Sequence, residues 1–363
     1  MVIPIWLSMS ITVFIIILGL TMKKSPLITI LLLIWEYILI AFNNGGPDIV
    51  NYYAMYNESV DNINTFIFGS GRFWTMWNVL SKNVFNLDMV HSHALIMIPV
   101  MLLFYIGIRK LTPNVNFVFA LMMIYPLPDM VIQRRQVIAM AFIVYALHFL
   151  KKKNITNQIL FIVFVMIAYG FHEMSLLFLP MMIVPYLNVD GILKTMIALD
   201  IVSFILVPVL SKYATSIFSV SRVELYTNQL QISTVKTIPF VIIHFSIVLL
   251  LYYLHKLYLK SNIRDKQDDF LLKISMISTI YSALYFTNTT FFRYFRSLIP
   301  ASFAYFANDS RKFSDRVQMQ VIIILAVIGL NLFFYVLFGQ IKFSGLILPI
   351  FRDNILFNPL GYT

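Results

Sequence analysis

The sequence predicts an all-α polytopic membrane protein with about twelve transmembrane helices. Hydrophobic residues make up 60% of the chain, charged residues make up 12%, and the mean hydropathy is +0.83. A soluble domain carries about 25% charged residues. The apolar runs are continuous over about 17–22 residues, as spanning helices require, whereas barrel strands alternate over about 10 residues.

Charge and cysteine content exclude some functions. The net charge is +11, but the basic residues are scattered through short loops between apolar runs, so we expect no nucleic-acid partner. The chain has no cysteine, which excludes disulfide and thiolate chemistry. The first apolar run, residues 2–20, has no basic start and no small-residue cleavage site. We therefore expect a retained helix and not a signal peptide.

The expected spans form a single integral membrane domain over residues 1–363. Three of them are short enough to be tilted, broken or partly re-entrant, namely 115–130, 174–187 and 294–308. The full set is 2–20, 27–42, 89–108, 115–130, 135–150, 155–171, 174–187, 192–211, 237–256, 270–287, 294–308 and 317–338.

Lysine and arginine are divided unequally between the two sides. Lysine-rich loops such as residues 151–153 are cytoplasmic by the positive-inside rule, which places both termini outside. The positive-inside rule needs only positive charge, which lysine supplies. Arginines on the outer side therefore indicate binding of an anion, because a guanidinium binds phosphate or carboxylate through two parallel hydrogen bonds. The alternative is ordinary pairing with outer acids. The outer arginines are Arg72, Arg134, Arg135, Arg222, Arg293, Arg296 and Arg352.

The first outer loop, residues 43–88, is predicted to hold two short helices. Asp48, Tyr52 and Tyr56 recur every four residues and share one helix face. They belong either to a site or to an interfacial tyrosine belt with a capping aspartate. Residues 72–86 carry apolar side chains at helical spacing, which predicts an amphipathic helix in the outer membrane interface.

Arg134 and Arg135 stand at the start of the fifth span. An ionised guanidinium beside hydrocarbon is costly unless an anion meets it, so we expect an anionic lipid-linked substrate here. Successive side chains on a helix point about 100° apart, so only one of the two arginines is expected to face the site directly.

His172 and Glu173 lie where the chain crosses between two spans, on the same outer side. A titratable pair inside an apolar hairpin is a site hypothesis, and the alternative is an interfacial histidine.

Two later outer elements are further candidates. The loop 212–236 contains Arg222 and is long enough to be a binding element. Arg293 and Arg296 are three residues apart and share a helix face, where they bind substrate or pair with an acid.

Four motifs, in this order and on one predicted side, carry a family resemblance. They are GPDIVNYYAMY (46–56), RQVIAMAF (135–142), FHEMSLLFLP (171–180) and RYFRS (293–297). With these motifs the chain resembles the EpsG-type family of bacterial exopolysaccharide polymerases, relatives in role of the Wzy O-antigen and capsule polymerases.

The resemblance implies a glycosyltransferase of the GT-C type in the bacterial cytoplasmic (inner) membrane, with its active site facing outward. Its implied donor and acceptor are polyprenyl-diphosphate-linked oligosaccharides. Membrane lipids and other polysaccharide-assembly proteins, such as a chain-length regulator, are the other expected partners, and no cofactor is expected.

Glycosyl transfer from a diphosphate needs cations at the leaving group and a base for the acceptor hydroxyl. No outer pair of acids suits a metal, so we expect arginines to replace it and no metal to be required. His172 is the first choice as base because its unperturbed pKa of about 6.5 suits neutral pH, with Asp48 and Glu173 as alternatives. The expected diphosphate ligands are Arg135, Arg293, Arg296 and, less directly, Arg134. The expected further substrate contacts are Tyr52, Gln136 and Arg222.

Two other functions share this composition. A flippase or transporter of lipid-linked oligosaccharide would use mid-membrane acids, for which Glu36 and Asp200 are the candidates. A membrane O-acyltransferase that modifies the polysaccharide would use a histidine together with a cytoplasmic basic site.

Overall fold

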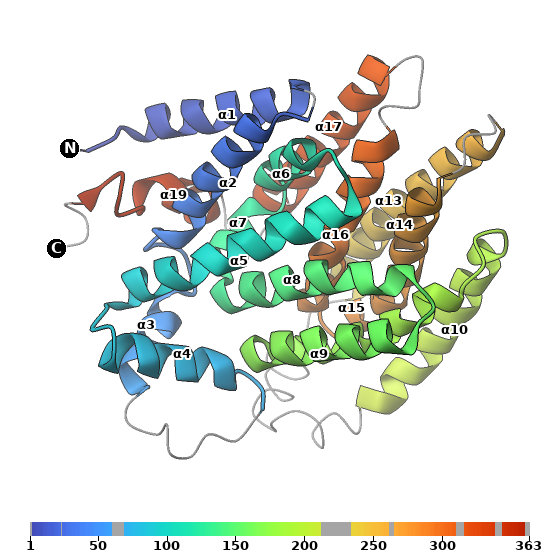
Figure 1. Cartoon of the computed structure of the whole chain (residues 1–363), viewed down its shortest axis with the longest axis horizontal. Helices are drawn as coiled ribbons and strands as arrows, with labels where there is room; N and C mark the ends of the chain where they lie inside the picture. Colours follow the sequence, from blue (N-terminus) through green and yellow to red (C-terminus); the bar gives the residue numbers. More distant parts are fainter. Residues whose placement is uncertain are drawn as a thin grey trace. The chain divides into compact units, whose positions relative to one another are not determined.

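The computed structural model describes residues 2–22, 24–59, 69–211, 234–260, 265–309, 316–337 and 343–359. Within these ranges every regular element is helical, and the extended pairing is one isolated antiparallel bridge between Asn43 and Asn354. In chain order (Figure 1) the elements are α1 (Ile5–Thr21), α2 (Pro26–Ala41), α3 (Ile49–Glu58), α4 (Arg72–Asn83), α5 (Met89–Leu111), α6 (Val115–Ile124), α7 (Leu127–Ile132), α8 (Arg134–Leu147), η2 (His148–Lys151), α9 (Ile155–Phe171), η3 (Glu173–Tyr186), α10 (Ile192–Ser211), α13 (Thr234–Lys260), α14 (Lys266–Ile277), η5 (Ser278–Tyr281), α15 (Ser282–Tyr285), η6 (Thr289–Phe292), α16 (Arg293–Asp309), α17 (Arg316–Leu332), η7 (Phe333–Leu337), α18 (Phe343–Leu346) and α19 (Leu348–Arg352).

The apolar helices agree with the predicted membrane class. Among the described residues, two helices are long and apolar enough to cross a membrane by length and composition, α5 and the Thr237–Leu257 part of α13. Shorter apolar helices include α1, α2, α6 and α9. The number of spans, their orientation and the GT-C-like arrangement stay predictions.

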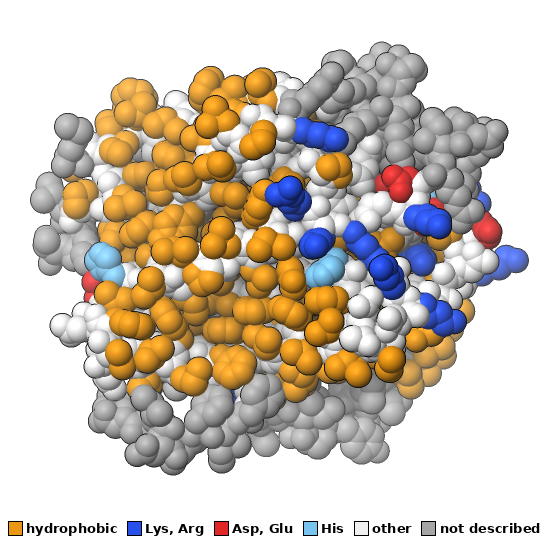
Figure 2. Space-filling view, in the orientation of Figure 1, with side chains coloured by type: hydrophobic (Ala, Val, Ile, Leu, Met, Phe, Trp, Pro, Cys, Tyr) orange, Lys and Arg blue, Asp and Glu red, His pale blue; other side chains and the backbone are white. Residues whose placement is uncertain are grey.

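One face of α5 is an exposed apolar stripe, as expected of a lipid-facing surface. Leu95, Ile98, Leu102 and Ile106 are all exposed, and their spacing of three or four residues places them along one helix face. Figure 2 shows hydrophobic side chains gathered where Figure 1 draws α1, α2 and α5. A large contiguous apolar surface is expected of a lipid-facing helix group and not of a water-soluble monomer.

Several expected spans are broken by proline or by a change of helix type. The span expected at 115–130 is two helices, α6 and α7, because Pro126 lies between them and lacks the backbone N–H that a continuous helix needs. The span expected at 174–187 is the 3₁₀ helix η3, which contains Pro180 and Pro185. The span expected at 270–287 is divided into α14, η5 and α15.

The chain forms two compact units, which are described separately. The first unit comprises Met1–Phe149, Ile159–Leu179 and Ala307–Thr363. In it α5 and α8 run side by side (Figure 1) and approach closely, because a Cβ at Gly107 would lie 3.0 Å from the Tyr145 backbone. The amide of Asn116 on α6 binds the Gly19 carbonyl at the end of α1 (2.8 Å).

The second unit comprises Leu150–Gln158 and Pro180–Phe306. Its interior holds His244 of α13, which is hydrogen-bonded to the hydroxyls of Ser278 (2.9 Å) and Tyr285 (2.8 Å). Asp200 of α10 accepts a hydrogen bond from Thr279 (2.8 Å). Buried polar side chains of this kind join neighbouring helices inside a membrane protein.

The two outer-loop helices form as expected, with different boundaries. α3 carries Tyr52 and Tyr56 on its buried side. The amphipathic helix predicted at 72–86 is α4, which ends at Asn83. Of the loop predicted at 212–236, residues 212–233 lie outside the described residues. The single domain over 1–363 stays a prediction.

Candidate functional site

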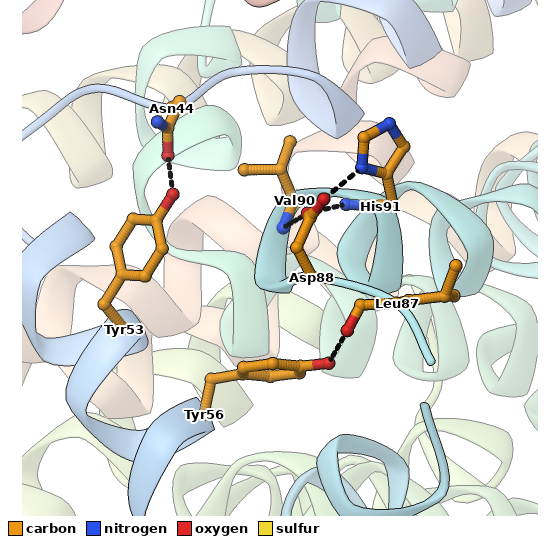
Figure 3. Close-up of polar contacts among 7 residues, drawn as sticks. All are labelled: Asn44, Tyr53, Tyr56, Leu87, Asp88, Val90 and His91. Atoms are coloured by element: carbon orange, nitrogen blue, oxygen red, sulfur yellow. Dashed lines mark hydrogen bonds and ion pairs between the residues drawn. The ribbon is translucent and has the colours of Figure 1, made fainter. Parts of the chain in front are cut away.

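The loop 43–88, predicted to be outer, is bound to the start of α5 by side-chain hydrogen bonds (Figure 3). The Tyr56 hydroxyl donates to the Leu87 carbonyl (2.5 Å), and the Tyr53 hydroxyl donates to the Asn44 side chain (2.9 Å). Asp88 caps α5 and pairs with His91 (2.5 Å). These contacts fix α3, and with it Tyr52, between Asn44 and the start of α5.

Tyr52 on α3 contacts both arginines of the pair Arg134 and Arg135. Its hydroxyl accepts a hydrogen bond from the Arg135 backbone N–H (3.4 Å), and its ring packs edge-on against Trp74 (5.8 Å). Burial raises the pKa of Tyr52, and the charge of Asp48 raises it further against the smaller opposing effects of Arg135 and Arg134. Tyr52 therefore stays a neutral phenol at physiological pH, and these three charged residues act on one hydroxyl.

Arg134 is buried, with 1% of its surface exposed. Its guanidinium donates to the Asn43 carbonyl (2.5 Å) and to the Met89 sulfur (2.7 Å) and lies over the Tyr52 ring, 5.5 Å from its centre. Contacts with a carbonyl and an aromatic face are those of a guanidinium that organises its surroundings. Arg134 thus connects the two sides of the outer loop to the start of α8.

Arg135 is half-buried and points elsewhere. Its Nε donates to the Phe171 carbonyl (2.9 Å) at the end of α9, and its Nη2 lies 2.4 Å from the place that a Cβ at Gly71 would take. The Phe171 carbonyl therefore holds one edge of the guanidinium. Of the two arginines, Arg135 is the one that combines fixed geometry with solvent exposure.

The backbone of Gly71 favours glycine, and its missing side chain leaves room for Arg135. Its φ is +67°, a conformation that residues with a side chain rarely adopt, and a Cβ there would collide with Arg135 Nη2. The Gly71 N–H also donates to the Tyr169 carbonyl (3.4 Å). The glycine therefore places the start of α4 against Arg135.

For the polymerase that the motifs predict, we expect Gly71→Ala to lower polymer formation at least about tenfold, because a misplacement near 1 Å at a reacting group is costly. Polymer laddering in cells, with protein amounts measured in parallel, gives the result. Gly329→Ala in α17 is the matched control, since a Cβ at Gly329 meets nothing within 4 Å. Wild-type laddering by Gly71→Ala would show that Arg135 needs no support from this turn.

His172 and Glu173 follow directly after the carbonyl that holds Arg135. The Met174 N–H donates to His172 Nδ1 (3.3 Å), which leaves the proton of the neutral ring on Nε2. Glu173 is 8% exposed and accepts from the Ser70 hydroxyl (3.3 Å). Gln136 is half-buried beside Arg135. The structure thus gathers these residues at the ends of α4, α8 and α9 in the first unit.

Asp48 occupies the N-cap position of α3, but its side chain makes no capping hydrogen bond. The carboxylate is half-buried and close enough to Tyr52 to affect its pKa. A purely structural capping role therefore does not describe Asp48. Its charge belongs with Tyr52 and the arginine pair.

The remaining predicted ligands are not tested by this geometry. Arg293 and Arg296 are half-buried at the start of α16 in the second unit, so their joint action with Arg135 stays a prediction. Arg222 lies outside the described residues. Within the described part of the chain, no group of three or more His, Cys, Asp or Glu is placed to hold a metal ion. Metal independence also stays a prediction.

Three contributors to the site were not singled out from the sequence. Gly71 had a signal, since it stands in a glycine-containing turn directly before a predicted helix. The carbonyls of Asn43 and Phe171 had none, because every residue has a carbonyl and only the fold selects which one receives a guanidinium.

The comparisons with known proteins agree with the motifs. Residues 24–350 match the EpsG family. No curated protein and no solved structure matches the chain. The match covers most of the sequence and all four motifs, and the family implies a membrane protein with a function of the exopolysaccharide-polymerase type. The resemblance is confirmed, and the chain belongs to the EpsG family.

Proposed function

We propose that this protein is a glycosyltransferase that joins polyprenyl-diphosphate-linked oligosaccharide repeat units at the outer face of the bacterial cytoplasmic membrane. The growing chain leaves its lipid diphosphate and is joined to a hydroxyl of the next lipid-linked unit. The observation that carries the proposal is the half-buried guanidinium of Arg135, which the Phe171 carbonyl holds. The backbone N–H of the same residue donates to the neutral Tyr52 hydroxyl, whose pKa the Asp48 carboxylate raises.

Arg135 supplies what the leaving group needs. Negative charge grows on the diphosphate as the glycosidic bond to it breaks, and a preorganised guanidinium stabilises that charge without further reorganisation. Its Nε is held by the Phe171 carbonyl, so its two terminal nitrogens are oriented before substrate arrives. Tyr52 adds a neutral hydroxyl donor next to the same backbone. Arg293 and Arg296 are proposed to bind the same diphosphate.

Asp48 and His172 have the two remaining roles, a base for the acceptor hydroxyl and a hydrogen-bond donor to the substrate. The acceptor hydroxyl loses a proton as it attacks, and Asp48 is proposed as its base. His172 holds its proton on Nε2 while Nδ1 accepts from Met174, so in this tautomer it donates to an oxygen of the substrate. Glu173 is bound to Ser70 and is the third choice as base.

The transporter alternative rests on Glu36 and Asp200. Glu36 is fully buried on α2 in the first unit, whereas Asp200 is bound to Thr279 in the second. A transport path needs polar groups that line a continuous route across the membrane. The described contacts join Asp200 to a neighbouring helix, which favours the structural role of an interhelical hydrogen bond for this acid.

A product assay separates the three functions. Purified protein in liposomes receives a short-chain polyprenyl-diphosphate oligosaccharide on the outer side. A polymerase forms new glycosidic bonds and releases polyprenyl diphosphate. A flippase moves the lipid without changing it, and an acyltransferase attaches an acyl group to the sugar. Translocation without new glycosidic bonds would overturn the proposal.

We expect polymerisation to continue in EDTA, because arginines replace the divalent cation at the diphosphate. The measurement is polymer length and yield in the liposome assay with and without the chelator. A metal-dependent glycosyltransferase serves as the positive control for chelation. Activity that disappears in EDTA and returns with magnesium would contradict metal independence.

A further inference from the structure

The C-terminal residues 349–357, here called the tail segment, run along the connection between α2 and α3. The Asn44 N–H donates to the Asp353 carbonyl (2.8 Å), and the Ile355 N–H donates to the Phe42 carbonyl (3.0 Å). Asn43 and Asn354 face each other between these bonds as an antiparallel bridge. Backbone pairing therefore joins the end of the chain to the start of the first outer loop.

Two asparagine side chains reinforce this pairing from opposite strands. The Asn43 amide donates to the Pro349 carbonyl (2.7 Å), and the Asn354 amide donates to the Ile38 carbonyl (2.8 Å). Both asparagines are fully buried. A buried amide without a partner is unfavourable, so the two bonds specify how the strands align.

The glycine pair at the start of the outer loop is explained by the same contact. A Cβ at Gly45 would collide with the Asp353 side chain, and Gly46 has a φ of +98°. Farther along the tail segment, Phe357 stacks on Trp35 (5.7 Å). The tail segment occupies a place that only glycine at position 45 leaves open.

This pairing reaches the candidate site through Asn43. The Asn43 side chain binds the tail segment, while its carbonyl accepts from Arg134 Nη2 (2.5 Å). Arg134 in turn lies over the Tyr52 ring, and the Tyr52 hydroxyl accepts from the Arg135 N–H. We infer that the tail segment is a positioning element of the diphosphate-binding site, with Asn354 and Gly45 as its positioning residues. Its meaning for catalysis rests on the proposed function.

The family match ends at residue 350, whereas the pairing uses Asp353, Asn354 and Ile355. The tail segment thus lies largely outside the part of the chain that the family shares. Its simpler role would be to cover apolar surface, as Phe357 does on Trp35. Coverage alone predicts no effect on the start of α8, and positioning predicts a specific one.

The test measures amide hydrogen exchange at the start of α8 in the purified full-length protein. Asn354→Leu removes the donor at similar volume, and Gly45→Ala displaces the tail segment from the other strand. We expect each change to speed exchange of the Arg135 N–H at least about tenfold, because its partner Tyr52 is no longer held. Asn354→Asp, which keeps the shape and loses the donor, replaces Asn354→Leu if that variant does not accumulate.

Two controls carry the same substitutions at neutral places. Asn83→Leu changes an exposed asparagine at the end of α4, and Gly329→Ala adds a Cβ that meets nothing within 4 Å. Both should exchange as wild type. A second test places Asn354→Leu in an Arg134→Met background, where it should add less than about twofold to exchange at Arg135, since coupled residues are not additive.

Unchanged exchange at Arg135 while exchange at residues 42–46 rises would overturn the inference, as would equal effects of Asn354→Leu with and without Arg134. Exchange needs no substrate, so it decides the inference whether or not the protein polymerises sugar. Polymer formation by an Arg135 variant decides the proposed function separately.

Discussion

Arg135→Lys is expected to reduce polymer formation by about 10²–10³-fold, the usual cost of removing one preorganised donor from a developing negative charge. Lysine keeps the charge but has no planar fork, so it cannot keep the Phe171 carbonyl on one edge and grip a diphosphate with the other. The measurement is polymer laddering in cells, with single repeat units on lipid expected to persist.

Arg109→Lys is the matched control for this change. Arg109 is exposed on α5 in the same unit, where its guanidinium lies 5.9 Å from the Tyr105 ring centre. We expect that variant to polymerise as wild type. Full-length polymer from Arg135→Lys at normal protein amounts would remove Arg135 from the diphosphate site.

Asp48→Asn is expected to slow polymerisation by about 10²–10⁴-fold, the usual contribution of a positioned base. Aspartate and asparagine have nearly the same shape, so the substitution removes the charge and keeps the size of the side chain. The initial rate in the liposome assay should therefore fall while the melting temperature stays near that of wild type.

Three variants compared across pH identify the base. Asp48→Asn should abolish the acid limb of the pH–rate profile, because that limb reports protonation of the base. His172→Ala should also lose long chains but keep the acid limb, since a donor does not set it. Glu173→Gln should keep both the long chains and the acid limb. If His172→Ala is the variant without the limb, the base is His172, the residue preferred from the sequence.

The features that the sequence predicts best are local and repeated along the chain. Apolar runs mark the helices because each span must bury its own backbone hydrogen bonds in hydrocarbon. Helical spacing likewise separated Arg134 from Arg135 before their contacts were known. Where helix type changed within an apolar run, as in η3 or between α14 and α15, hydrophobicity alone gave no signal.

The sequence by itself determined that this is a helical membrane protein and that its motifs are those of the EpsG family, and it predicts that the outer side is rich in arginine. These properties follow from residue type and spacing along the chain. Only the tertiary structure decided that Arg134 is enclosed while Arg135 is half-buried, that Gly71 has a left-handed backbone conformation beside Arg135, and that the tail segment pairs with Asn43. The physical reason is that every residue has a backbone carbonyl, so residue type does not show which carbonyl accepts a hydrogen bond. Distant parts of the chain must pack together before such contacts and close approaches are fixed.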